Sequence, residues 1–141
     1  ANDSFTSVCF SQRATATETD SSLKKNKTNS NDLLVACGSH FGYLNIYDVL
    51  TGVLKLRQRP HEACIRQIRF SQSGRYLITS SDDGTCKIID LEISNKPKEE
   101  KYNKFNENLD FLNAKICGEL KQDASKDNRT PINALDISKN N

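Results

Sequence analysis

Several features that mark exported, membrane-spanning or metal-binding proteins are missing from this 141-residue sequence. It has no run of about 18 apolar residues and no N-terminal signal pattern, so neither a membrane span nor secretion is supported. Its five cysteines are odd in number and include no C-x-x-C pair, which argues against a disulfide framework or a zinc site. We therefore expect reduced cysteines, packed as small hydrophobic side chains, in an intracellular protein of the cytoplasm or nucleus.

An excess of charge of one sign is also missing. The 20 Lys and Arg residues and 18 Asp and Glu residues give a net charge of +2, which is too balanced for a dedicated nucleic-acid surface. The sequence has no Gly-rich phosphate loop and no metal-ligand spacing. We therefore expect no cofactor and no bound metal.

The most informative stretch is 60–92, which reads as an antiparallel meander. Residues 71–74 and 82–85 are turn signals, because their glycines adopt positive φ angles cheaply and Asp-Gly suits a tight hairpin. They separate three short runs rich in aromatic and β-branched residues, which are typical of strands. These runs are 65–70, 76–79 and 86–90.

This stretch resembles a WD repeat of the β-propeller family. The matching residues are His61 before the first strand, Ser81 closing the second, Asp83 in the tight turn and Asp90 closing the third. In the family such a His, Ser and Asp join a Trp of the third strand in a buried hydrogen-bonded set. The resemblance therefore implies a structural tether formed by His61, Ser81 and Asp83, with Ile89 standing where the Trp would be.

An internal repeat supports this resemblance. Aligning Asp48 on Asp90 gives an offset of 42 residues, within the ~40–45 expected of one propeller repeat. Residues 5–12 and 132–138 both match the strand that begins at Ile65, so three copies of one inner strand are visible. The sequence thus predicts an all-β fold, a partial β-propeller of four-stranded antiparallel blades with long insertions on one rim.

The repeat also predicts how the chain is divided. Residues 1–59 form a first WD-repeat-like blade, in which the polar segment 13–32 is a disordered insertion. Residues 60–127 form a second blade with an insertion at 93–113, and 128–141 supply the first strand of a third blade. Because two blades and one strand cannot close a ring of at least four, we expect an excerpt of a longer protein or one section of a ring completed elsewhere.

The conformation after residue 101 is left open by its pattern. The apolar residues step by three or four, as in an amphipathic helix, although a fourth strand must also precede residue 128. We predict a short helix at 101–112 and a strand at 114–121, and an all-strand or fully disordered segment remains an alternative. The apolar positions are Tyr102, Phe105, Leu109, Leu112, Ile116 and Leu120.

The two insertions should lie on one rim, because loops after the first and third strands leave a blade at the same end. The opposite rim keeps short turns, and in the family this short-turn face commonly receives peptide segments of partner proteins. The resemblance implies a partner-binding surface there. Its lining residues are His40, Phe41, Arg57, Arg59, Glu62 and Asp82.

The resemblance implies a non-catalytic scaffold that binds other proteins. A hydrolase triad is not expected from His61, Ser81 and Asp83, because two of them lie on short turns and no oxyanion donors can be named. The alternative is an RNA- or DNA-associated propeller whose insertion-bearing rim is basic, although neighbouring glutamates dilute that charge. The basic residues are Lys24, Lys25, Lys27, Lys96, Lys98, Lys101 and Lys104.

Overall fold

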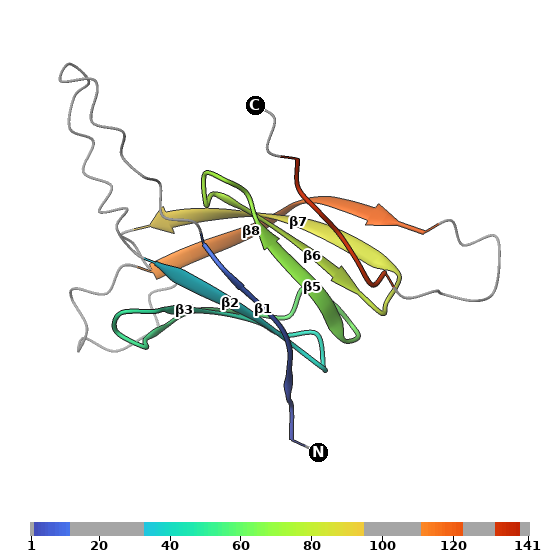
Figure 1. Ribbon diagram of the computed structural model, residues 1–141, viewed down its shortest axis with the longest axis horizontal. Coiled ribbons are helices and arrows are strands. Elements are labelled where there is room, and N and C mark those ends of the chain that lie inside the picture. Colours follow the sequence, from blue (N-terminus) through green and yellow to red (C-terminus); the bar gives the residue numbers. More distant parts are fainter. Residues whose placement is uncertain (1, 12–32, 95–110, 123–131, 139–141) are drawn as a thin grey trace.

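The computed structural model describes residues 2–11, 33–94, 111–122 and 132–138, in which eight strands form two four-stranded antiparallel sheets (Figure 1). Each sheet follows chain order, and we call the sheets blade 1 and blade 2. Blade 1 consists of β1 (Phe5–Phe10), β2 (Leu34–Ser39), β3 (Leu44–Asp48) and β4 (Leu54–Gln58). Blade 2 consists of β5 (Ile65–Phe70), β6 (Tyr76–Ser81), β7 (Thr85–Ser94) and β8 (Phe111–Lys121).

The two blades repeat even their irregularities. The β1–β2 ladder shifts register between Phe5 and Ser7, and the β5–β6 ladder shifts between the matching residues Ile65 and Gln67. The β3–β4 and β7–β8 ladders also shift at equivalent points, just before Tyr47 and Ile89. Since bulges redirect a strand and its twist, their recurrence shows that the two repeats share one backbone design. The predicted strands of the two blades are therefore confirmed, with ends displaced by a few residues.

The predicted helix at 101–112 is wrong where the structure describes it. Residues 111 and 112 belong to β8, which pairs with β7 from Thr85 to Ser94. The insertion therefore narrows from 93–113 to 95–110, which lies outside the described residues, as does the insertion at 13–32. Of the six apolar positions, the structure describes Leu112, Ile116 and Leu120, and their steps of four fit a strand as well as a helix.

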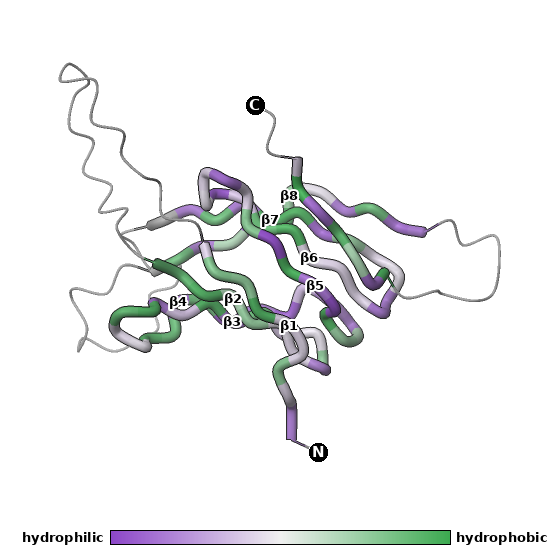
Figure 2. The backbone as a smooth tube through the Cα atoms, viewed as in Figure 1, coloured by the Kyte–Doolittle hydropathy of each residue, from purple (hydrophilic) through white to green (hydrophobic). Residues whose placement is uncertain are grey.

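The hydrophobic core lies between the two blades. Apolar residues follow the strands that face each other, and Figure 2 shows these stretches in green. The buried apolar residues of the cluster are Ala36, Leu44 and Ile46 of blade 1 and Ile65, Ile68, Phe70, Leu77, Ile89, Leu91 and Leu112 of blade 2. Burial of this apolar surface holds one blade against the other.

The two blades pack tightly where Gly38 of β2 faces the Ile65 side chain of β5. A Cβ atom on Gly38 would stand only 2.5 Å from Ser7 Oγ and 2.7 Å from Ile65 Cγ2, so a larger side chain would push the blades apart. The hydroxyl of Thr6 donates a hydrogen bond of 2.7 Å to the Ile65 carbonyl. Polar contacts therefore support the apolar packing at the inner strands.

The face of blade 1 that points away from blade 2 is uncovered. Val8 and Phe10 are 58% and 57% exposed, whereas the matching Ile68 and Phe70 of blade 2 are 1% and 9% exposed. The same positions therefore serve as core in blade 2 and as open apolar surface in blade 1. This difference is expected of two neighbouring blades in an open arc.

Residues 132–138 run beside β5 in Figure 1 without forming an assigned strand. The Leu135 N–H donates to Gln67 Oε1 at 2.8 Å, and the Ile132 N–H donates to the Ser81 carbonyl at 3.3 Å. Their role as the first strand of a third blade, and the boundaries 1–59, 60–127 and 128–141, stay predictions.

The cysteines depart from the expected burial. All five are free, but only Cys64 is buried, Cys9, Cys37 and Cys86 are half-buried, and Cys117 is exposed. Cys117 is exposed because β8 forms the outer edge of blade 2. No helix in the described ranges is long and apolar enough to cross a membrane.

Candidate functional site

His61 is a buried residue of the β4–β5 loop that connects three parts of blade 2. Its Nδ1 lies 2.9 Å from Asp83 Oδ2 and 3.1 Å from Thr85 Oγ1, and its Nε2 lies 2.7 Å from Thr79 Oγ1. Because a carboxylate can only accept, we assign the proton to Nδ1, which leaves Nε2 to accept from the Thr79 hydroxyl. The imidazole thus links the loop before β5 to β6 and to the β6–β7 turn.

The protonation state of this tether follows from its surroundings. Burial lowers the pKa of His61 below its ordinary value of 6.5, and this effect outweighs the opposite influence of the Asp83 carboxylate. Burial raises the pKa of Asp83, but hydrogen bonds from Thr85, from His61 and from the Glu62 N–H hold it below its usual value. At neutral pH the tether therefore consists of a neutral imidazole and an ionised carboxylate.

Ser81 does not hydrogen-bond to His61, although the sequence grouped it with His61 and Asp83. Its hydroxyl donates to the Ala63 carbonyl at 3.2 Å and accepts from the Asp83 N–H at 3.2 Å. Thr79, two residues earlier on the same face of β6, occupies the position beside the imidazole instead. A nucleophile–base pair between Ser81 and His61 is therefore not formed.

Sequence reasoning missed Thr79 and Thr85 as members of the tether. The alternation of β6 places Thr79 and Ser81 on the same face, but alternation does not tell which of them meets the ring. Ile89, at the position expected for a Trp, is fully buried in the core between the blades. An apolar side chain thus occupies the position of the Trp that hydrogen-bonds to the His, Ser and Asp in the family.

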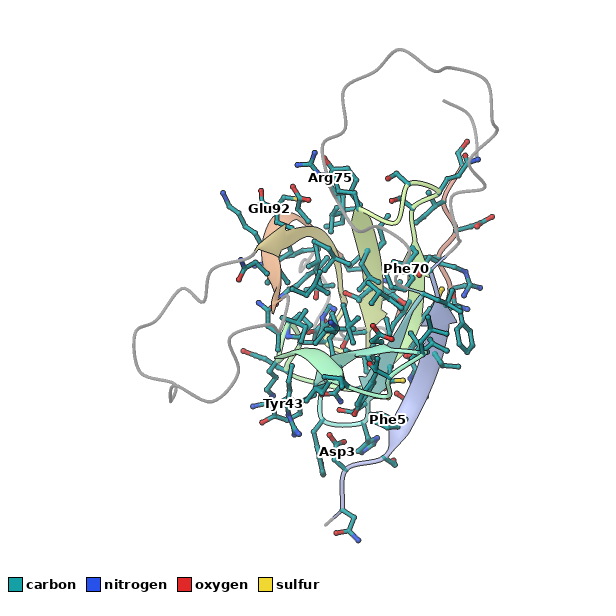
Figure 3. The ribbon with its side chains drawn as sticks, turned by 90° about the vertical axis from the view of Figure 1, so that its left-hand side faces the viewer. Asp3, Phe5, Tyr43, Phe70, Arg75 and Glu92 are labelled. Carbon is teal, nitrogen blue, oxygen red and sulfur yellow. The ribbon has the colours of Figure 1, made fainter. Side chains whose placement is uncertain are left out.

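The short turns meet at one end of the two blades. Figure 3 shows Asp3 and Tyr43 at this end, with Arg75 and Glu92 at the opposite end. The Phe41 N–H donates to Asp3 Oδ1 at 3.1 Å, and the His61 N–H donates to the Gly42 carbonyl at 3.4 Å. These bonds join the β2–β3 turn both to the segment before β1 and to the β4–β5 loop.

Gly42 explains why this junction is tight. Its φ angle is +84°, and a Cβ atom built on it would lie 2.1 Å from the His61 carbonyl oxygen. No other residue type fits this position without displacing the loop that carries His61. The backbone of the short-turn face is therefore fixed before any partner arrives.

Four of the six predicted partner-binding residues lie close together beside Tyr43. They are His40, Phe41, Arg57 and Arg59. The Arg57 and Arg59 guanidinium carbons lie 4.7 Å and 5.6 Å from the Tyr43 ring centroid. Arg59 Nε also donates to the Phe41 carbonyl at 3.0 Å, and the His40 ring packs edge-on to Phe41 with centroids 5.3 Å apart. Phe41 remains 37% exposed, so it lies on the surface rather than in the core.

The remaining two residues lie on loops of blade 2. Asp82 accepts a two-point ion pair from Arg66, with distances of 2.7 Å and 2.6 Å. Glu62 is exposed, and its N–H donates to Asp83 Oδ2 at 3.2 Å. Sequence reasoning did not single out Tyr43 or Arg66, whose roles depend on cross-strand and loop contacts.

The opposite end carries a different polar arrangement. Arg75 makes two hydrogen bonds, of 2.9 Å and 3.0 Å, to the carboxylate of Asp90, which has its pKa lowered by this pairing. In blade 1 the matching Asp48 accepts from the N–H groups of Leu50 and Thr51, which lower its pKa. Asp48, which ends β3, therefore organises a turn, whereas Asp90, which lies inside β7, forms an ion pair. No group of three or more His, Cys, Asp or Glu in the described part of the chain could hold a metal.

The family comparison agrees with this geometry. The model of the family described as WD domain, G-beta repeat, matches residues 52–90, which include β4, His61 and the tight turn of blade 2. The chain is similar to a WD repeat-containing protein 55 homolog from Dictyostelium discoideum, at 39% identity over 62 residues. This match covers 43% of the chain and 15% of that protein.

A longer match reaches into both blades. The chain is similar to the Target of rapamycin complex subunit LST8 of Saccharomyces cerevisiae, at 26% identity over 107 residues. That match covers 72% of the chain and 33% of the yeast protein. The chain thus spans a third or less of the length of these relatives.

One solved structure shares the arrangement of the blades. The β-propeller domain of Cps50 (Swd1) from Myceliophteria thermophila superimposes with a TM-score of 0.57 at 18% identity. The superposition covers 86% of this chain and 30% of that domain chain. Together with the two described sheets, it confirms the predicted fold class, a partial β-propeller of four-stranded antiparallel blades.

Proposed function

We propose a function from the premise that this chain belongs to the WD-repeat β-propeller family: it forms part of a non-catalytic scaffold that binds other proteins. The observation that carries the proposal is the short-turn face, where an aromatic side chain stands exposed on a fixed backbone. Phe41 is 37% exposed, and its turn is held by Asp3 on one side and by the Gly42–His61 contact on the other. An anchor that is already ordered loses little entropy when a partner binds.

The partner is a peptide segment of another protein, lying across His40, Phe41, Arg57 and Arg59, with Glu62 and Asp82 at its blade 2 end. The yeast relative carries the words complex subunit in its name, which supports a role inside an assembly. We place the protein inside the cell, in the cytoplasm or the nucleus. The lysines of the alternative nucleic-acid rim lie outside the described residues, so no contact of the structure favours that alternative.

The experiment compares two exposed aromatic residues at opposite ends of the blades. Phe41 and Tyr76 are each 37% exposed, and Tyr76 follows Arg75 at the end away from Tyr43 (Figure 3). Partners recovered with the wild-type protein are measured against Phe41→Ala and Tyr76→Ala, and the unfolding of each variant is recorded. We expect Phe41→Ala to weaken capture about tenfold without loss of stability, and Tyr76→Ala to leave capture unchanged.

Two results would contradict this proposal. If Phe41→Ala lowers stability while the affinity of the folded fraction is unchanged, Phe41 supports the fold and is no anchor. If Tyr76→Ala weakens capture and Phe41→Ala does not, partners bind the insertion-bearing end.

A further inference from the structure

The short-turn face contains two guanidinium groups that share one aromatic ring. Arg57 lies at the end of β4 and Arg59 two residues later, and both pack on Tyr43 at 4.7 Å and 5.6 Å from its centroid. The two cations are therefore at most about 10 Å apart, a separation close to the Debye length of about 8 Å at physiological salt. Two like charges held this closely repel each other, and an anion between them would relieve that repulsion.

Two of the three other arginines in the described ranges are paired with a carboxylate, whereas the third, Arg69, donates to the Ile68 carbonyl at 3.1 Å. Arg66 and Arg75 each make a two-point ion pair, with Asp82 and Asp90, at distances of 2.6 Å to 3.0 Å. Within the described ranges, no carboxylate lies within ion-pair distance of Arg57 or Arg59, although the Asp3 carboxylate is near enough for the charge of Arg57 to help lower its pKa.

Within the described residues, most guanidinium N–H groups of Arg57 and Arg59 make no hydrogen bond. Arg59 uses its Nε on the Phe41 carbonyl, which fixes the group and leaves both terminal nitrogens to bind a ligand. Arg57 donates to no described acceptor, and stacking on Tyr43 holds it in place. A planar guanidinium that is already oriented matches a carboxylate with two parallel hydrogen bonds.

We propose that Arg57, Arg59 and Tyr43 form a clamp for carboxylates of an acidic peptide segment, and that Phe41 contacts an apolar residue of the same segment. This inference rests on the proposed function, because it names the chemistry of the partner that the short-turn face binds. The carboxylates of two acidic residues replace the water around the two guanidinium groups. The apolar residue covers the exposed part of the Phe41 ring.

The surrounding charges favour a peptide over a nucleic acid. Asp3 holds the turn of Phe41 through its carboxylate, and the exposed Glu62 lies on the adjoining loop. These carboxylates would repel a continuous phosphate backbone, which requires a broad run of cations. A peptide with a few well-placed acidic residues can bind the two arginines and avoid the neighbouring carboxylates.

The test measures binding of synthetic peptides to the 141-residue chain by fluorescence anisotropy. The probe is a labelled peptide of about twelve residues, in which glutamates flank a central leucine. Its control replaces every Glu by Gln, and a labelled single-stranded RNA of similar charge serves as the second probe. The protein variants are Arg57→Gln and Arg59→Gln, with Arg75→Gln at the opposite end of the blades as a matched control whose arginine is already paired with Asp90.

The clamp predicts that the Glu peptide binds about tenfold or more tightly than the Gln peptide, and that Arg57→Gln and Arg59→Gln each remove most of this difference. Arg75→Gln should leave the affinity unchanged, and Arg57→Lys should restore only part of it, because lysine cannot form the two-point contact. Chemical unfolding of each variant verifies that the exposed substitutions leave the fold intact.

Three results would overturn the inference: no preference for the Glu peptide, a preference that survives both Gln variants, or RNA that binds more tightly than the peptide through the same arginines. These failures differ from a failure of the proposed function. If Phe41→Ala weakens the binding of a partner protein while both arginine variants bind it normally, the proposed scaffold function is supported and the acidic nature of the partner is contradicted.

Discussion

Replacing His61 by alanine removes the one side chain that hydrogen-bonds to Thr79, Asp83 and Thr85 at once. The imidazole is 1% exposed and Thr79 is fully buried, so water cannot readily replace these bonds. An unsatisfied buried partner costs about 1–3 kcal/mol, and the space left by the ring adds to this cost. We expect His61→Ala to lower the free energy of unfolding by about 2–4 kcal/mol.

The second histidine of the chain supplies the matched control. His40 is exposed, and its ring contacts the edge of Phe41, so His40→Ala should cost less than about 0.5 kcal/mol. Urea unfolding followed by far-UV circular dichroism measures both, since the sequence has no tryptophan. Equal midpoints for His61→Ala and His40→Ala would refute the view that the tether stabilises blade 2.

Further predictions concern packing, backbone and pH. Phe70→Ala should cost about 3–4 kcal/mol and Phe10→Ala under about 1 kcal/mol, because these matching residues are 9% and 57% exposed; similar losses in urea unfolding would contradict the interblade core. Gly42→Ala should abolish cooperative unfolding or lower its midpoint strongly, whereas Gly74→Ala, with φ +72° and open space, should cost about 1 kcal/mol. Because the pKa of His61 is lower in the folded than in the unfolded protein, the unfolded state binds a proton first as the pH falls. The free energy of unfolding should therefore be highest above pH 6.5 and decrease below it, and His61→Ala should lack this decrease.

Local patterns were sufficient to predict the strands and the repeat. Gly74 and Gly84 each adopt positive φ in the turns that flank β6, so turn chemistry alone set the strand ends in blade 2. The offset between Asp48 and Asp90 then transferred these boundaries to blade 1. Their agreement with the structure follows from the identical register of the two sheets.

Contacts between distant segments were beyond a reading of one sequence. Thr79 and Ser81 share a face of β6, and only the position of the His61 loop decides which hydroxyl meets the ring. The role of Tyr43 depends on Arg57 of β4 and Arg59 of the following loop, whose guanidinium groups pack on its ring. The strand start at residue 111 was missed because the steps of three and four that lead to Leu112 are typical of a helix.

Site-specific photo-crosslinking in the cell tests the central claim, that partners bind the short-turn face, most directly. A photoreactive phenylalanine analogue replaces Phe41 in one sample and Tyr76 in another, two positions of equal exposure at opposite ends of the blades. We predict a discrete crosslinked protein from position 41 and none from position 76. Crosslinking from position 76 alone, or in equal yield from both positions, would contradict the account.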